Sequence, residues 1–274
     1  MSKHIAIIVE GIRREINYWK SIENVFFSGT SLDIVPLSAD KNIYMIWNIM
    51  RADCYETDII EILRENSASA KIALDGYCRD DFQEIYLFFD YDPQQNNLGL
   101  SDKDYYTVLS EMMQTFDNET ENGKLYFSYP MCEALRDLNG NSCASLTACF
   151  FPYDLISEYK SRSGLKSKYA DHRKYDFETW KIFIATFVKR TLCLFDKYDS
   201  SSLQWYKSFI TPIAILKREN MLFEKRKMIF VLSAFSEFLL DYYPKEHFPW
   251  LPDIVQSLSE DDCAQKDVVQ LNDE

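Results

Sequence analysis

Glycine, histidine and long apolar runs are scarce in this chain. Its 274 residues include only seven glycines and three histidines. The sequence contains no Walker loop and no Gly-x-Gly-x-x-Gly motif, so we expect no ATP hydrolysis by this chain itself. No Gly-x-Ser-x-Gly elbow supports nucleophilic catalysis, and no two histidines have metal-binding spacing. No apolar run approaches the roughly 18 residues that a membrane-spanning helix needs.

The seven cysteines are scattered and form no Cys-x-x-Cys pair. Zinc-ribbon and thioredoxin-like chemistry therefore have no support in the sequence. An odd number of dispersed thiols is typical of reduced cysteines in a reducing compartment. The first residues also lack the pattern of a secretory signal. We therefore expect a cytoplasmic protein that does not enter a membrane.

The chain is acidic, with 43 acidic residues, 30 basic residues and a formal net charge of −13. Proteins that act on nucleic acid usually carry a basic surface. Long-range repulsion would weaken the binding of an acidic chain to a polyanion. A nucleic-acid substrate would therefore require clustered basic residues, a bound metal or a basic partner to offset that repulsion.

Two apolar runs in the first part of the chain each end in a carboxylate. Residues 5–9 precede Glu10, and residues 85–89 precede Asp90 and Asp92. Short runs rich in β-branched and aromatic residues are typical of buried parallel strands. Ligands bind at the carboxyl ends of such strands. Carboxylates that converge there would repel one another, so the pattern predicts a divalent cation, and Mg²⁺ prefers oxygen ligands.

Each of these carboxylates also has a simpler interpretation. Glu10 could be an exposed turn residue, with Gly11 serving only to permit the turn. Asp90 and Asp92 share one face of an extended strand, but an Asx turn before Pro93 would use the same two residues. The apolar run directly before each motif favours the metal site.

The order of these motifs along the chain resembles a known domain. Glu10-Gly11, with Glu15 four residues beyond the glycine, is followed by Asp90-Tyr91-Asp92. This order resembles the Toprim domain of topoisomerases, bacterial primases and overcoming-lysogenization-defect nucleases. The stretch from Ser128 to Glu133 is similar to the Ser-x-Pro-x-x-Glu segment of Toprim proteins in anti-phage and abortive-infection systems, such as RloB-like proteins and the AriB effector of the PARIS system. The resemblance covers residues 1–155.

The resemblance implies a Mg²⁺- or Mn²⁺-dependent nuclease that hydrolyses DNA or RNA. Glu10 would act as general base or metal ligand, and Asp90, Asp92 and Glu133 as metal ligands. It further implies a toxic anti-phage effector that is activated through a separate sensor ATPase. From the charge balance we expect a homodimer on activation, since self-association after release would bring two basic clusters around residues 160–174 onto one substrate. Glu133 also stands in the first turn of a helix predicted after Pro130, where a carboxylate is favoured electrostatically without any metal.

Basic residues that could contact substrate phosphates occur in two places. Arg13 and Arg14 follow Glu10-Gly11, where related proteins more often have a small residue or Thr and one basic residue. A second group is interleaved with tyrosines, which suits backbone contacts combined with base stacking, although a solvated linker has the same composition. This second group consists of Lys160, Arg162, Lys166, Lys168, Arg173 and Lys174.

The order of predicted elements favours an α/β fold. Strands and helices alternate in the first part, which predicts a Toprim-type parallel sheet flanked by helices. The later sequence has a helical pattern, including predicted helices at 177–198, 203–223 and 228–243. We therefore expect a Toprim-like metal-binding catalytic domain at 1–155 and a helical region at 156–274 that ends in a frayed acidic tail.

Two other functions fit the same residues. A Toprim-like domain could keep its carboxylates for structure and act as a non-catalytic interaction or regulatory subunit, which the acidic composition favours. A hydrolase of nucleotides or other small phosphate esters would use the same metal-binding carboxylates. A metal titration with nucleic-acid cleavage, comparing wild type with Glu10→Ala, would separate the three functions.

Overall fold

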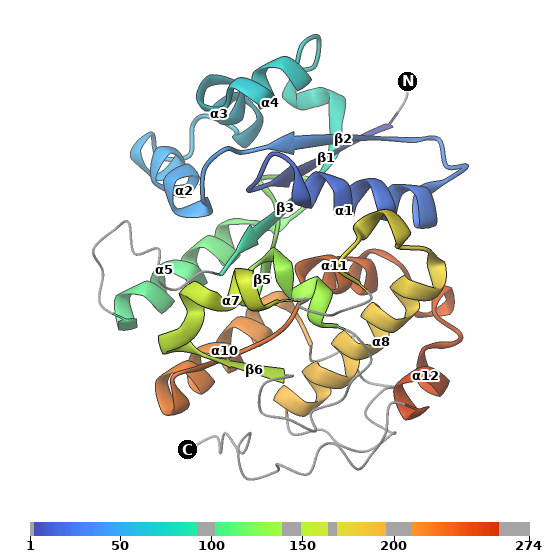
Figure 1. The fold of residues 1–274 in the computed structure, drawn as a ribbon. Coiled ribbons are helices and arrows are strands. Elements are labelled where there is room, and N and C mark those ends of the chain that lie inside the picture. The colour runs from blue at the N-terminus through green and yellow to red at the C-terminus, as the bar shows by residue number, and fades with distance from the viewer. Residues whose placement is uncertain (1–2, 92–101, 139–148, 164–168, 196–209, 258–274) are drawn as a thin grey trace. The chain divides into compact units, whose positions relative to one another are not determined.

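The computed structural model describes residues 3–91, 102–138, 149–163, 169–195 and 210–257 (Figure 1). Within these ranges the chain has a mixed α/β fold, with a mostly parallel five-stranded sheet flanked by helices. This confirms the α/β fold that the sequence predicted. The chain divides into two compact units. Unit 1 comprises residues 1–90 and 95–126, and unit 2 comprises residues 91–94 and 127–274.

The sheet has the strand order β2-β1-β3-β5-β4. Its strands are β1 (Lys3–Val9), β2 (Leu32–Ser38), β3 (Phe82–Asp90), β4 (Asp117–Asn118) and β5 (Gly123–Ser128). β1 pairs in parallel with both β2 and β3, whereas β4 and β5 pair antiparallel. β5 begins in unit 1 and ends in unit 2, because the units divide after Tyr126.

The two apolar runs noted in the sequence form the centre of this sheet. Ile7, Val9 and Leu87 are completely buried, and so are most of their neighbours in β1 and β3. The parallel pairing aligns Val9 with Phe88. Strands that are buried on both faces show continuous apolar runs rather than alternation, which is why these two strands were predictable.

Helices of unit 1 cover both faces of the sheet (Figure 1). α1 lies on one face, and α2, α3 and α4 lie on the opposite face. Several of these helices begin at capping residues. The side chain of Asp58, for example, accepts hydrogen bonds from the backbone N–H groups of Ile60 and Glu61. These N–H groups would otherwise lack partners in the first turn of α3. The helices are α1 (Arg14–Ile22), α2 (Ile43–Ala52), α3 (Ile59–Asn66), α4 (Ala68–Ala73) and α5 (Asp102–Thr115), with a π-helical turn at Glu23–Phe27 and a 3-10 turn at Arg79–Asp81.

Helices α2 and α3 are separated by a break in the backbone. Cys54 and Tyr55 lie between α2 and α3 and both have left-handed backbone angles, with φ of 58° and 62°. Two consecutive non-glycine residues in this region cannot continue a right-handed helix. The break therefore has a local backbone cause.

Unit 2 is mainly helical. Its longest helix, α8 (Phe177–Leu194), buries a wide apolar stripe that includes Trp180, Phe183 and Phe187. It begins at the residue where the helix 177–198 was predicted to begin; residues 196–198 lie outside the described residues. The other helices are α7 (Ile156–Arg162), α10 (Pro212–Arg226), α11 (Ala234–Tyr242) and α12 (Leu251–Ser257), with 3-10 turns at Cys132–Asp137, Tyr153–Leu155, His172–Lys174 and Lys245–His247. The domain boundary predicted near residue 155 falls inside this unit.

One predicted helix of unit 2 is wrong at its start. Residues 228–230 form the short strand β7 (Met228–Phe230), which pairs antiparallel with β6 (Phe150–Pro152), and helix α11 begins only at Ala234. Lys227 ends α10 in a left-handed conformation with φ of 51°. This reverses the chain before three apolar residues that suit a strand. The predicted segment 203–209 lies outside the described residues.

Candidate metal-binding site

The carboxyl ends of β1 and β3 lie where the strand order of the sheet changes direction. From β1 the chain proceeds to β2 on one side, and then returns to β3 on the other side of β1. In open α/β sheets, ligands bind outside the carboxyl ends of the strands that flank such a switch point. Glu10 directly follows β1, and Asp90 is the last residue of β3. Unit 1 therefore holds both residues at the edge of the sheet that suits ligand binding.

Glu10 and Asp90 are hydrogen-bonded to each other. The backbone N–H of Asp90 donates to Oε2 of Glu10 at 3.3 Å, and both residues are partly exposed. Glu10 therefore reaches across from β1 to the end of β3. Asp92, the third carboxylate of the predicted site, lies outside the described residues.

Gly11 makes room for a further carboxylate. A Cβ atom added at Gly11 would lie 2.6 Å from Oε2 of Glu15 and 2.8 Å from Oε1, closer than real contacts allow. Glu15 is buried in the first turn of α1. Its carboxylate thus lies against the backbone of the residue that follows Glu10, and the missing side chain of Gly11 permits this approach.

The loop between β1 and α1 presents one of its two arginines to solvent. Arg13 is exposed, whereas Arg14 is partly buried at the first position of α1. Ile12, beside them, is 57% exposed. An exposed arginine three residues after Glu10 is well placed to meet an anionic ligand, because a guanidinium can bind phosphate oxygens through two parallel hydrogen bonds.

Unit 2 contributes a buried thiol and carboxylate from one turn. The helix predicted after Pro130 is instead a 3-10 helix that begins at Cys132. Glu133 is 1% exposed, and Sγ of Cys132 donates to its Oε2 at 3.2 Å. The other carboxylate oxygen, Oε1, lies 3.8 Å from Nζ of Lys160. These contacts involve a thiol and an ammonium group, so Glu133 is more than a capping residue of its helix.

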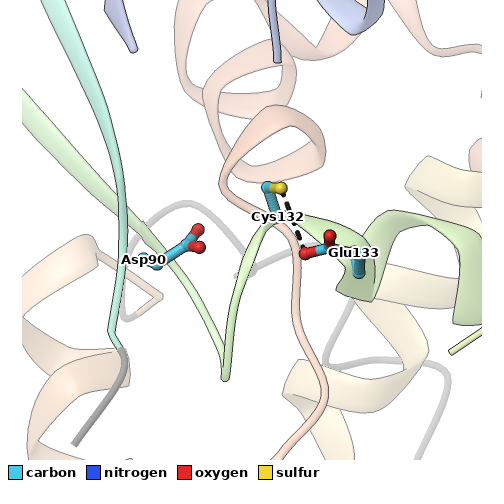
Figure 2. Close-up of side chains that lie close together, drawn as sticks. All are labelled: Asp90, Cys132 and Glu133. Carbon is cyan, nitrogen blue, oxygen red and sulfur yellow. Dashed lines mark hydrogen bonds between the residues drawn. The ribbon is translucent and has the colours of Figure 1, made fainter. Parts of the chain in front are cut away.

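The thiol and the carboxylate of this turn face each other within unit 2, and Figure 2 shows the hydrogen bond between Cys132 and Glu133. The turn is close in the chain to the residue that follows Asp90. Tyr91 donates its backbone N–H to the carbonyl oxygen of Ser128 at 3.0 Å, and the chain reaches Cys132 four residues after Ser128. A thiol and a carboxylate are both groups that bind cations in proteins.

A polar network in unit 2 holds the far end of the 3-10 helix that bears Cys132 and Glu133. The hydroxyl of Tyr159 donates to Oδ2 of Asp137 at 2.7 Å, and the Arg190 guanidinium donates to the carbonyl oxygens of Asp137 and Val231. Burial, followed by the nearby Asp137 carboxylate, raises the pKa of Tyr159 well above its ordinary value. Tyr159 therefore stays a neutral hydrogen-bond donor. Ser163 also donates to the carbonyl oxygen of Glu133 at 2.9 Å.

The predicted basic group has a mixed outcome. Arg162 pairs with Glu158 at 2.5 Å, and Arg173 pairs with Asp171 at 2.8 Å. The hydrogen bond from Arg173 lowers the pKa of Asp171 to about 2. Lys160 approaches Glu133, as described above, and Lys174 is exposed. Both described arginines thus already face carboxylates, which reduces the positive charge they offer to a substrate; Lys166 and Lys168 lie outside the described residues.

The sequence interpretation did not single out Cys132. It treated all seven cysteines as dispersed thiols, because none belongs to a Cys-x-x-Cys pair. The sequence did contain one local indication that Cys132 lies close to Glu133. Cys132 directly precedes the glutamate of the Ser-x-Pro-x-x-Glu stretch and therefore had to lie near any site that Glu133 enters.

No protein-family model, no curated protein and no solved structure matches this chain. None of the helices in the described parts of the chain has the length and apolar character that crossing a membrane requires.

Proposed function

We propose that this chain is a metal-dependent nuclease that hydrolyses phosphodiester bonds in DNA or RNA, as its resemblance to Toprim proteins implies. The observation that carries the proposal is the meeting of Glu10 and Asp90 at the switch point of the sheet, where the N–H of Asp90 binds the Glu10 carboxylate. Two partly exposed carboxylates at this position suit a site for a divalent cation and an anionic substrate.

The residues present fit a divalent cation. Glu10 and Asp90 place two carboxylates at the carboxyl ends of β1 and β3, and the N–H of Asp90 donates to Oε2 of Glu10. Mg²⁺ or Mn²⁺ bound by such oxygens would activate a water molecule and stabilise the charge that develops on the phosphoryl group. The side chains have separate tasks in this proposal. Asp90 and Glu133 hold the cation, and Glu10 accepts a proton from the attacking water or serves as a further ligand.

Arg13 and Lys160 supply positive charge in this proposal. Arg13 is exposed in the loop after Glu10 and would bind a substrate phosphate. The ammonium group of Lys160 lies 3.8 Å from Glu133, and its side chain is 69% exposed. This lysine can turn from the carboxylate to a phosphate, because most of its side chain already lies in water.

Cleavage assays with matched variants test the proposal. Wild-type protein should cleave DNA or RNA with Mg²⁺ or Mn²⁺ and stop when the cation is chelated. Glu10→Gln and Asp90→Asn should each lose about 100-fold or more, because each removes a metal-binding or proton-accepting carboxylate. Glu84→Gln is the control, since Glu84 lies on the same strand as Asp90 and its carboxylate accepts the Tyr86 hydroxyl.

Three outcomes would each contradict part of this proposal. Undiminished cleavage in both Glu10→Gln and Asp90→Asn would remove the catalytic assignment. Hydrolysis of nucleotides without cleavage of nucleic acid would indicate a small phosphate ester as substrate. A folded wild-type protein without hydrolytic activity on either, alone or with its partner, would indicate a regulatory subunit.

We also propose that the protein is a toxic anti-phage effector controlled by a separate sensor ATPase. Its net charge of −13 supports a partner, because repulsion from a polyanion must be offset. Expression with the products of neighbouring genes, followed by native mass measurement, should reveal a complex with a larger ATPase and a homodimer after activation. A protein that stays monomeric, binds none of these products and is fully active alone would contradict this proposal.

A further inference from the structure

Basic residues gather on one helix of unit 2, although the chain as a whole is acidic. Residues 212–227 comprise α10 and the residue that ends it, and they include five basic and two acidic side chains. The whole chain has the opposite balance, with 30 basic and 43 acidic residues. We call the five basic residues of this helix the basic strip: Lys217, Arg218, Lys225, Arg226 and Lys227.

The two acidic residues of α10 do little to cancel this charge at the surface. Glu219 is buried, and burial raises its pKa well above the ordinary value, which favours the neutral form. Glu224 is exposed. Four residues of the basic strip are also exposed, and Arg218 is partly exposed. The helix therefore presents more positive than negative charge to solvent.

Packing orders the end of α10 from which three of these cations project. The backbone N–H of Lys227 donates to the carbonyl oxygen of Phe223 at 2.9 Å, and Nζ of Lys227 lies 4.2 Å from the centre of the Phe223 ring. Phe223 packs edge-on against Tyr153. The N–H of Tyr153 in turn donates to the carbonyl oxygen of Lys227 at 2.9 Å. The basic residues at this end thus stand on backbone that is fixed within unit 2.

The spacing of the basic strip suits a polyanion with regularly repeated charges. Arg218 and Lys225 are seven residues apart, which is about two helical turns, so both lie on one side of α10. Lys217 and Lys227 are ten residues apart, or about 15 Å along the helix. One strand of a nucleic-acid duplex has a phosphate every ~3.4 Å of axis. The strip therefore matches the length of about four phosphates of one strand.

The helix dipole explains only part of the basic strip. It favours cations in the last turn of a helix, where Lys225 and Arg226 lie. The effect falls off within that turn. Lys217 and Arg218 lie about two turns earlier, so their presence on the same helix has no such explanation.

We propose that the basic strip of α10 is a nucleic-acid-binding surface that contacts the phosphate backbone of the substrate. The inference rests on the proposed function for the identity of the polyanion, but binding at this surface needs neither a metal ion nor hydrolysis. Contacts to phosphates position a protein on nucleic acid without reading its sequence. The strip would also offset part of the repulsion that a net charge of −13 causes.

Binding measured in EDTA tests the surface separately from cleavage. Wild-type protein is titrated into labelled duplex DNA and duplex RNA between about 50 and 200 mM salt. Binding should weaken as salt rises, because each neutralised phosphate releases a counterion. The triple variant Lys225→Gln, Arg226→Gln, Lys227→Gln should bind at least about 10-fold more weakly at the lowest salt. It should also reduce the slope of log K against log salt by about 2–3.

A second triple variant controls for net charge. Lys20→Gln, Lys71→Gln and Lys245→Gln together remove the same three positive charges from exposed positions on three separate elements. This variant should keep the affinity and the salt slope of wild type, because charges far from the bound phosphates are screened over about 10 Å. Thermal melting of both variants identifies any loss of fold, which exposed substitutions should not cause.

The outcomes separate this inference from the nuclease proposal. Wild-type protein that binds neither duplex, equal losses in the two triple variants, or a folded α10 variant that binds as tightly as wild type would overturn the inference. A loss on one duplex alone would support it and identify that nucleic acid as the one bound. Binding through the strip by a protein that cleaves no nucleic acid would support the inference and reject the nuclease.

Discussion

Glu10 of unit 1 and Glu219 of unit 2 are carboxylates in opposite surroundings. In unit 1, Glu10 is partly exposed at a strand end and binds the N–H of Asp90. In unit 2, Glu219 on α10 is 1% exposed, and Oε2 accepts the N–H of Phe230 at 3.0 Å. Its other oxygen, Oε1, is buried with no hydrogen-bond partner among the described residues. The two carboxylates therefore differ in what they meet: Glu10 has a neighbouring carboxylate at the edge of the sheet, whereas Glu219 belongs to no group of metal-ligating side chains in the described chain.

The pKa values of Glu219 in unit 2 and of Asp40 in unit 1 are shifted in opposite directions. Burial raises the pKa of Glu219 well above its ordinary value, and the single hydrogen bond from Phe230 does not compensate. Asp40, next to the end of β2 in unit 1, is affected in the other direction. Its partial desolvation is outweighed by hydrogen bonds from Ser69, Ser67 and Ser38, at 2.8, 2.8 and 3.0 Å, so its pKa is lowered.

Truncating each glutamate should give the largest contrast between the units. Glu219→Ala should lower the free energy of unfolding by about 2–4 kcal/mol, because it leaves a cavity and a buried N–H without a partner. Glu10→Ala should change it by less than about 0.5 kcal/mol, or raise it slightly, because repulsion at the strand ends is relieved. Urea denaturation with wild type as reference measures both.

The prediction would be wrong if Glu10→Ala lowered the free energy of unfolding more than Glu219→Ala does. A Glu10→Ala protein that is much less stable than wild type would mean that the strand-end carboxylate serves the fold. Glu219→Gln separates charge from shape in the same experiment, since glutamine fills nearly the same volume and stays neutral.

Smaller, opposite effects should appear in the pH dependence of stability. A carboxyl with a raised folded pKa stabilises below its unfolded value of about 4.3, and this contribution is lost as the pH rises through the folded pKa. Glu219→Gln should therefore flatten the decline of unfolding free energy on the alkaline side. A carboxyl with a lowered pKa stabilises above about 3.9, and this contribution is lost as the pH falls. Asp40→Asn should flatten the acid side, by less, because Asp40 is exposed.

Urea titrations at several pH values would measure both profiles. Parallel profiles of wild type and Glu219→Gln from about pH 5 to pH 9 would show that Glu219 is ionised inside unit 2. Parallel acid limbs of wild type and Asp40→Asn would show that the three serines hold Asp40 no better in the folded chain than water does in the unfolded one.

The predictable parts of the molecule are those set by local patterns. The strands before Glu10 and Asp90 were found because buried parallel strands have continuous apolar runs, and the parallel pairing of β1 with β3 then brings both carboxylates to one edge. The α8 stripe was found because its period is that of a helix. In each case a few neighbouring residues contain the whole signal.

The remaining features depend on contacts between distant positions or on very short elements. Asp40 meets Ser67 and Ser69, which lie 27 and 29 residues away in the sequence. Strands β6 and β7 have three residues each, too few to show alternation. The burial of Glu219 follows from its contact with Phe230 across a chain reversal at Lys227. A local sequence pattern does not indicate which distant residues will contact each other.

The position of β5 in the sheet has a consequence for how the chain is made. β5 adjoins β3, yet 32 residues separate Asp90 from Gly123 in the sequence. During synthesis the apolar strand β3 therefore leaves the ribosome well before the strand that pairs with its free side. An emerging chain that stopped before residue 123 would expose an unpaired apolar edge, which is a template for aggregation. Slow synthesis over residues 91–122 would therefore prolong a state that is prone to aggregation, whereas the complete protein pairs this edge with β5.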